Sequence, residues 1–340
     1  MMNTSQKLIA LLSGAALLSV SSLAAQTATT DPVGYVSVTV NGTGGVASEA
    51  FTYMGVPLHK ASDAAGAITG TGANTITASA AAWTVDAYAG SYILITSGTN
   101  EGVSATISSN TATELTTVED LTSLLAGDES FSIHAYTTIA DVFGAANEAG
   151  LGGGASSSAA DTILIQSASG FTTYYFKDSG FIGGTGWRSS TDAATDQSAT
   201  TISFGEGVII VRKQSADLDV VLTGSVFSGD AISPVEAGFN WKAASIPVDL
   251  TLNGLFGPAN EAGIDGGASS AAADNIIVPT PGGLVTYYYK DSGFIGGTGW
   301  RTSTDASADQ GATVFVQPGQ MFLINRSGGA AFNLTEVSPL

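Results

Sequence analysis

Two copies of one twelve-residue segment carry most of the side chains in this chain that could bind a ligand. The segment KDSGFIGGTGWR runs from Lys177 to Arg188 and recurs unchanged from Lys290 to Arg301. An aromatic run precedes each copy, so flat rings stand beside charged groups. Sugars are bound by such rings together with charged or amide groups that bridge hydroxyls. The candidate ligand-binding residues are therefore Tyr175, Lys177, Asp178, Trp187, Arg188, Tyr288, Lys290, Asp291, Trp300 and Arg301.

The same pattern also has a purely structural interpretation. Alternate side chains of a strand face inwards, so half of these aromatic residues are expected in a core. Trp187 and Arg188 could stack on each other and close a hairpin. Packing is the more common role for such residues, and it is the interpretation that we favour at this stage.

Acidic residues in the Gly/Ser/Thr-rich loops of both copies could hold calcium through carboxylate and backbone oxygens. These residues are Asp178, Asp192, Asp196, Asp291, Asp305 and Asp309. However, the sequence contains no D-x-[DN]-x-[DN]-G loop, and an aspartate more commonly caps its own turn. We therefore expect no cofactor, keep calcium as the alternative, and assign no metal ligands.

No motif in the sequence indicates catalysis. The two histidines, His59 and His134, lie outside the duplicated region, and there is no cysteine, H-E-x-x-H, G-x-S-x-G or P-loop. Glu148 and Glu261 could be imagined as the carboxylate pair of a glycosidase. They occupy equivalent positions in the two copies, so each is expected in a helical turn of its own ANEAG stretch. We expect the chain not to be an enzyme.

The duplication extends well beyond the twelve-residue segment. Residues 143–197 align without a gap to 256–310, with 38 identities in 55 positions at an offset of 113. By the same offset, the apolar run Val208–Val211 is expected to correspond to Met321–Ile324. Short β-rich runs, aromatic strands and Gly-rich connections within each copy predict hairpins.

The chain as a whole is predicted to be all-β. Alternating apolar and polar residues and Thr/Asn/Gly turns between residues 33 and 136 predict a small N-terminal β domain, assigned to 26–136. Two homologous β-sandwich- or barrel-like domains are expected to follow. We call them repeat A (137–226) and repeat B (227–340).

The N-terminus has the pattern of a secretory signal peptide over residues 1–25. Lys7 supplies the positive charge, an apolar stretch covers Leu8–Leu18, and small residues follow up to Ala25. No later stretch approaches the roughly 18 apolar residues of a spanning helix, so no transmembrane segment is expected in the mature chain. We expect an exported protein of the periplasm, the outer cell surface or the extracellular space.

The charge of the chain restricts its partners. The net charge is −19, and removal of residues 1–25 leaves 9 − 29 = −20. Nucleic acids and anionic membrane surfaces are bound by clustered Lys and Arg, so neither is an expected partner. Only 11% of the residues are charged, against about 25% in ordinary domains. The exterior is therefore expected to consist mainly of Ser, Thr, Asn, Gly and Ala.

Several motifs together resemble a known family. They are DPVGY at Asp31–Tyr35, the S-G-x-x-x-G turn at Ser97–Gly102, NTATELT at Asn110–Thr116, and the later G-W-R and P-G-Q elements. With these motifs the chain resembles a β-rich family of exported paralogous proteins of verrucomicrobial bacteria. The resemblance spans the mature chain, but its motifs are features of turns and strands. It implies no activity and transfers no functional residue.

Together these features favour an exported, non-catalytic structural or cell-surface protein that can self-associate. Its expected partners are copies of itself or components of the cell envelope. The first alternative is a carbohydrate-binding module that uses the duplicated aromatic hairpins, with polysaccharide as its partner. The second alternative is a secreted glycan-active enzyme.

Overall fold

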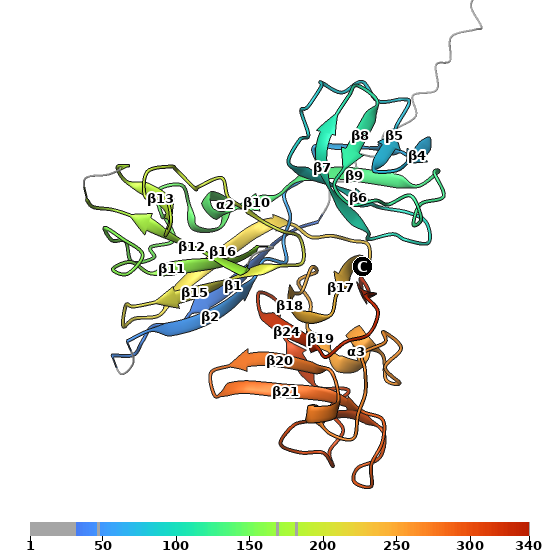
Figure 1. Cartoon of the computed structure of the whole chain (residues 1–340). Helices are drawn as coiled ribbons and strands as arrows, with labels where there is room; N and C mark the ends of the chain where they lie inside the picture. Colours follow the sequence, from blue (N-terminus) through green and yellow to red (C-terminus); the bar gives the residue numbers. More distant parts are fainter. Residues whose placement is uncertain (1–31, 46–47, 168–169, 181–182, 340) are drawn as a thin grey trace, which may run out of the picture. The chain divides into compact units, whose positions relative to one another are not determined.

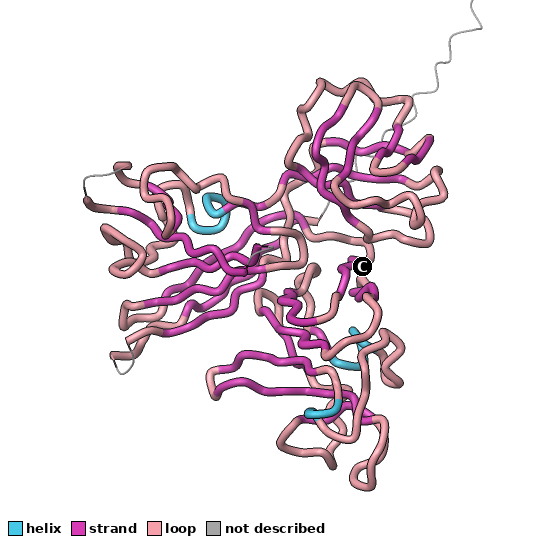
Figure 2. The backbone as a smooth tube through the Cα atoms, viewed as in Figure 1, coloured by secondary structure: helices cyan, strands magenta, loops and turns pink. Residues whose placement is uncertain are grey.

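The computed structural model describes residues 32–45, 48–167, 170–180 and 183–339. The expected signal peptide at 1–25 lies outside this range. Strands far outweigh helices in the described chain (Figure 2), and all pairings between the named strands are antiparallel. The all-β prediction is confirmed, and none of the sheets in the described residues closes into a barrel. Within the same residues, no helix is long and apolar enough to cross a membrane.

Repeat A is organised around a five-stranded sheet with the order β13-β12-β11-β15-β2. Two two-stranded sheets, β1-β16 and β10-β14, and one short helix, α2, complete it. The elements are β1 Val33–Val40, β2 Ala50–Gly55, β10 Thr137–Thr138, α2 Ile139–Phe143, β11 Thr162–Ser167, β12 Gly170–Lys177, β13 Gly186–Ser189, β14 Thr201–Ile202, β15 Gly207–Arg212 and β16 Leu218–Ser225.

Repeat B contains the same strands and helix in the same chain order, with one additional 3₁₀ turn, η1. Its five-stranded sheet has the order β22-β21-β20-β24-β18, and its two-stranded sheets are β17-β25 and β19-β23. The elements are β17 Ala231–Val235, β18 Gly238–Ala243, β19 Leu250–Thr251, α3 Leu252–Phe256, the 3₁₀ turn η1 Ser270–Ala272, β20 Asn275–Thr280, β21 Gly283–Lys290, β22 Gly299–Thr302, β23 Val314–Val316, β24 Met321–Arg326 and β25 Phe332–Glu336.

Strands β1 and β2 belong to the sheets of repeat A, which differs from the expected boundary at residue 136. β1 pairs with β16 along its whole length, and β2 pairs with β15. In Figure 1 the blue strands accordingly lie beside yellow ones. Val40 and Met54 are fully buried in the core of repeat A. The apolar residues of this N-terminal segment are therefore buried by partners more than 150 residues away, which a local pattern cannot indicate.

Between β2 and β10 the chain forms a separate seven-stranded sheet. In repeat B the equivalent strands, β18 and β19, are joined directly by residues 244–249, so the sheet is an insertion into repeat A. Its order is β3-β9-β6-β7-β8-β5-β4. The strands are β3 Ala64–Ala67, β4 Gly70–Gly72, β5 Thr75–Thr77, β6 Ser91–Ile95, β7 Ser104–Asn110, β8 Glu114–Thr117 and β9 Ser130–Ala135.

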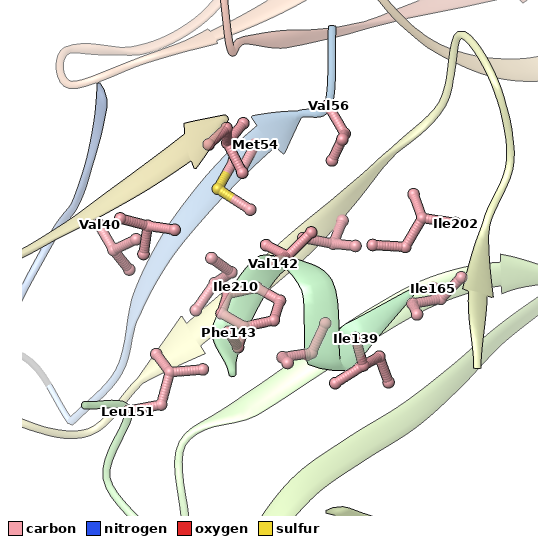
Figure 3. Packing of buried hydrophobic residues seen from close by; sticks show 14 of the residues in the cluster. Val40, Met54, Val56, Ile139, Val142, Phe143, Leu151, Ile165, Ile202 and Ile210 are labelled. Carbon is pink, nitrogen blue, oxygen red and sulfur yellow. The ribbon is translucent and has the colours of Figure 1, made fainter. Parts of the chain in front are cut away.

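The core of repeat A lies between its sheets and α2. Ile139, Val142 and Phe143 of the helix are buried in one cluster with Ile165 and Ile210 of the five-stranded sheet (Figure 3). The helix begins with a capping box, in which Thr138 and Asp141 each bond the other's backbone N–H. The ANEAG stretches do not form the expected helical turn. They form non-helical turns, and α2 and α3 end shortly before them, at Phe143 and Phe256.

The match between the repeats shifts by one residue near its C-terminal end. Equivalent residues at the centres of the two sheets show the shift. The offset in residue number between β11 and β20 is 276 − 163 = 113, but between β15 and β24 it is 324 − 210 = 114. The pairs are Ile163 with Ile210 and Ile276 with Ile324. Val208 therefore corresponds to Phe322, and the expected match to Met321 is wrong. A bulge takes up the extra residue in β23, where the register with β19 shifts.

The buried tryptophan of each repeat should carry a large share of its stability. We expect Trp300→Ala to lower the free energy of unfolding by about 3–5 kcal/mol, because it leaves a large cavity in a closed core. Phe294→Ala is the matched control, since Phe294 is fully exposed and its loss should change this energy by less than about 0.5 kcal/mol. Urea denaturation measures both variants, and equal effects would contradict the packing role.

Candidate functional site

The tryptophans of the duplicated segment are core residues. Trp187 and Trp300 are both 0% exposed. The indole Nε1 of Trp187 donates to the carbonyl of Gly144 at 2.8 Å, and that of Trp300 donates to Gly257 at 3.0 Å. Phe176 meets the Trp187 ring edge-on at 5.3 Å. These rings therefore present no face to a sugar.

The other face of each hairpin is covered by the repeat's own loops. Tyr175 pairs with Arg188 across the strands, and both side chains are buried. Nη1 of Arg188 donates to the Trp187 carbonyl at 2.7 Å and to Asp196 at 3.1 Å, while Nη2 donates to the Gly183 carbonyl. Its guanidinium is thus occupied by the Gly-rich loop that it closes.

The lysine of the segment is used in a similar way. Lys177 is 3% exposed, and its Nζ donates to the carbonyls of Ser179 at 2.8 Å and Ala155 at 3.4 Å. Asp178 is exposed and accepts a hydrogen bond from the Ser179 hydroxyl at 2.8 Å. Of the five candidate residues in repeat A, only Asp178 therefore reaches solvent.

Repeat B places its five candidate residues in the same way. Tyr288, Lys290, Trp300 and Arg301 are buried, and Asp291 is exposed. Arg301 donates to Asp309 at 2.8 Å and to the carbonyls of Trp300 and Gly296. The two copies of the segment are brought together within their own repeats as packing units, and neither forms an open aromatic platform.

The loop acids cap turns or pair with the buried arginines. Asp192 accepts hydrogen bonds from the backbone N–H groups of Ala194 and Thr195. The Thr195 side chain contributes most to holding the pKa of Asp192 below its usual value, and the two backbone bonds add to this effect. Asp305 forms the equivalent turn in repeat B. Among the described residues, no group of three or more Asp, Glu or His side chains is arranged to hold a metal ion.

The two glutamates considered as a catalytic pair serve separate turns. Glu148 accepts from the N–H of Ala146 at 3.0 Å, and Glu261 accepts from the N–H of Ala259 at the same distance. Each carboxylate closes the turn that follows its own helix. The described structure therefore does not assemble them into one acid–base site.

Sequence reasoning missed a buried cluster around the two histidines. The rings of His59 and His134 lie 6.0 Å apart, and His59 Nδ1 is 2.8 Å from the Tyr92 hydroxyl. Phe204 packs against His59 with its centroid at 4.7 Å. Burial, with a smaller contribution from His134, lowers the pKa of His59 to about 3. His59 is therefore neutral at physiological pH and cannot act as an acid there.

Sequence reasoning also missed the contacts that join the two repeats. Gly55 on β2 donates its N–H to the carbonyl of Gly319, and Ala243 on β18 donates to the carbonyl of Gly205, both at 2.9 Å. Gly55 and Ala243 are equivalent, because each pairs with the first residue of β15 or β24. Gly205 and Gly319 are equivalent by the offset of 114. The two bonds are therefore related by an approximate two-fold axis.

Aromatic side chains gather on the outward faces of these two edge strands. Phe51 and Tyr53 on β2 correspond to Phe239 and Trp241 on β18 by the same register. The rings of Tyr53 and Trp241 stack across the axis, with centroids 5.5 Å apart and planes at 13°. We call Phe51, Tyr53, Trp241 and Phe239 the aromatic strip. An aromatic residue at alternate strand positions was the only sequence signal for it.

The histidine cluster makes the stability of the protein depend on pH. The unfolded chain takes up a proton on His59 near pH 6.5, whereas the folded chain does so only near pH 3. The unfolded state thus binds more protons between these values, and the contribution of the neutral, buried ring is lost as the pH falls from 6.5.

We expect the wild-type protein to lose about 2 kcal/mol more unfolding free energy between pH 7 and pH 5 than His59→Asn, which keeps an acceptor for Tyr92 but does not titrate. Urea denaturation at both pH values measures the difference. Identical pH dependence in the two proteins would show that His59 titrates normally.

Comparison with protein-family models, curated proteins and solved structures finds no match for this chain. A function for this chain therefore has to be inferred from the geometry of its own residues. That geometry assigns the duplicated segment to packing and leaves the aromatic strip as the candidate surface.

Proposed function

We propose that this chain is an exported, non-catalytic structural protein of the cell surface. The observation that carries the proposal is the use of the duplicated segment. In both repeats, its cations bind backbone carbonyls and its tryptophan is fully buried. The most strongly repeated chemistry of the chain thus supports the fold.

Self-association is the mode of action that the repeat unit supports best. The edge strands β2 and β18 meet through two equivalent hydrogen bonds and a ring stack. Such a reciprocal contact is isologous, which is the type of interface that joins identical subunits. A unit that associates with its own copy inside one chain is suited to assemblies of the same kind between chains or with related envelope proteins.

The alternatives from the sequence have less support. Carbohydrate binding by the hairpins requires exposed rings, and Tyr175, Trp187, Tyr288 and Trp300 are at most 2% exposed. A glycan-active enzyme requires two carboxylates at one site, and Glu148 and Glu261 each close their own turn. A structural role is consistent with the burial of these rings and with the turns that the two glutamates close.

The location and assembly of the protein test this proposal. We expect cells that express the full chain to hold it at their surface, where added protease degrades it without lysis. The purified chain from Gln26 should sediment partly as assemblies larger than a monomer, and free sugars should not dissolve them. Analytical ultracentrifugation and cell fractionation measure these properties. A chain that is released into the medium as a monomer, or that hydrolyses glycans, would overturn the proposal.

A further inference from the structure

The aromatic strip exposes large rings that the fold does not need for its cores. Phe51 is 51% exposed and Phe239 is 67% exposed, and both lie on the solvent face of their strands. Phe171, 41% exposed, meets the Trp241 ring edge-on at 6.1 Å and widens the strip. Single exposed apolar residues are ordinary, but several in contact mark a binding surface.

A groove lies along one half of the strip. It has a volume of about 520 Å³, which falls in the range of ligand pockets. Phe51 and Tyr53 form part of its wall, and the turn at Gln317–Gln320 of repeat B forms another part. Rings and turn are held together by the Gly55–Gly319 hydrogen bond. The groove is therefore a built feature of the junction between the repeats.

The lining of the groove selects the charge of its ligand. No Asp, Glu, Lys, Arg or His lines it. The protein carries a net charge of −19, which disfavours an anionic polymer, and the groove has no carboxylate with which to attract a cation. A neutral ligand is the one that these walls accept without burying an unpaired charge.

The polar groups of the groove are hydroxyls and amides with free bonding capacity. The side chains of Ser37, Asn41 and Gln317 line it and make no hydrogen bond to another of the described residues. Amides donate and accept at once, so they suit ligands that carry many hydroxyls. Aromatic rings present a negative face against which the C–H groups of a sugar ring pack.

We propose that the groove and the aromatic strip bind a neutral polysaccharide. Phe51 and Tyr53 alternate on one strand face at about 7 Å, and Trp241 and Phe239 continue the row beyond the axis. Such a row fits an extended chain of sugar units rather than a single sugar. The site is separate from the duplicated hairpins, and it goes beyond the structural role proposed above.

Affinity electrophoresis of the purified chain from Gln26 tests the site. The probes are three soluble neutral polysaccharides, hydroxyethylcellulose, galactomannan and arabinoxylan. We expect at least one of them to retard the wild-type protein, and Phe51→Ala and Trp241→Ala each to weaken binding about tenfold, as the loss of an aromatic anchor does. Asn41→Ala should also weaken it, without removing a ring.

Phe294→Ala is the matched control, because Phe294 is an exposed aromatic outside the groove and the strip, and it should bind as the wild type does. Unchanged melting temperatures will show that the variants are folded. The proposal is overturned if folded wild-type protein is retarded by none of the three probes, or if Phe294→Ala weakens binding equally.

Sedimentation of Phe51→Ala separates this site from the assembly surface. If the variant loses self-association and the wild type shows no retardation, the strip is a contact between copies and the glycan proposal fails while the structural role stands. If the wild-type protein is retarded by a polysaccharide but never assembles, the glycan proposal stands and the self-associating structural role fails.

Discussion

Each repeat depends on one hydrogen bond between a buried indole and a glycine carbonyl. In repeat A it joins the hairpin to the end of α2 through Gly144, whose φ of 86° lies in the left-handed region. A Cβ at Gly144 would also lie 2.8 Å from the backbone N of Glu148 and displace its carboxylate, so both the φ angle and the close approach favour glycine. The helix end, the ANEAG turn and the hairpin are therefore fixed relative to one another by a single buried ring. Repeat B uses Trp300, Gly257 and Glu261 identically, so the tryptophan of each segment has a structural role that needs no ligand.

The junction between the repeats follows from a second constraint, the open edges of their sheets. An unpaired edge strand is a template for unwanted pairing. Here β2 and β18 each form one edge of a five-stranded sheet, and each directs a backbone N–H to the glycine turn of the other repeat. The edges thus protect one another, and their outward side chains are brought together as a consequence. The aromatic strip exists only because the repeats are joined in this way.

The sequence was sufficient for the features that depend on local pattern. The aromatic runs that precede the two copies of the segment were expected to be strands and lie within β12 and β21, and the all-β class is confirmed. It was insufficient where distant segments decide the outcome. Alternation alone places Phe176 inward, but the burial of Tyr175 on the opposite face requires a loop that folds back over it. The pairing of β1 with β16 spans 180 residues between Thr39 and Asp219.

The burial of most basic residues makes the surface of the protein strongly acidic. Nine of the ten Lys and Arg residues lie in the described part of the chain, and six of these are buried: Lys177, Arg188, Arg212, Lys290, Arg301 and Arg326. Only four buried carboxylates are present in the described residues, namely Glu129, Asp161, Asp274 and Glu336. The exterior is consequently more acidic than the composition suggests, and like-charged copies repel each other beyond contact. Salt at physiological strength screens that repulsion over roughly 8 Å, so association has to occur at patches without charge. The uncharged groove and aromatic strip have that property, so an uncharged polysaccharide can bind there without opposing the negative charge of the surrounding surface.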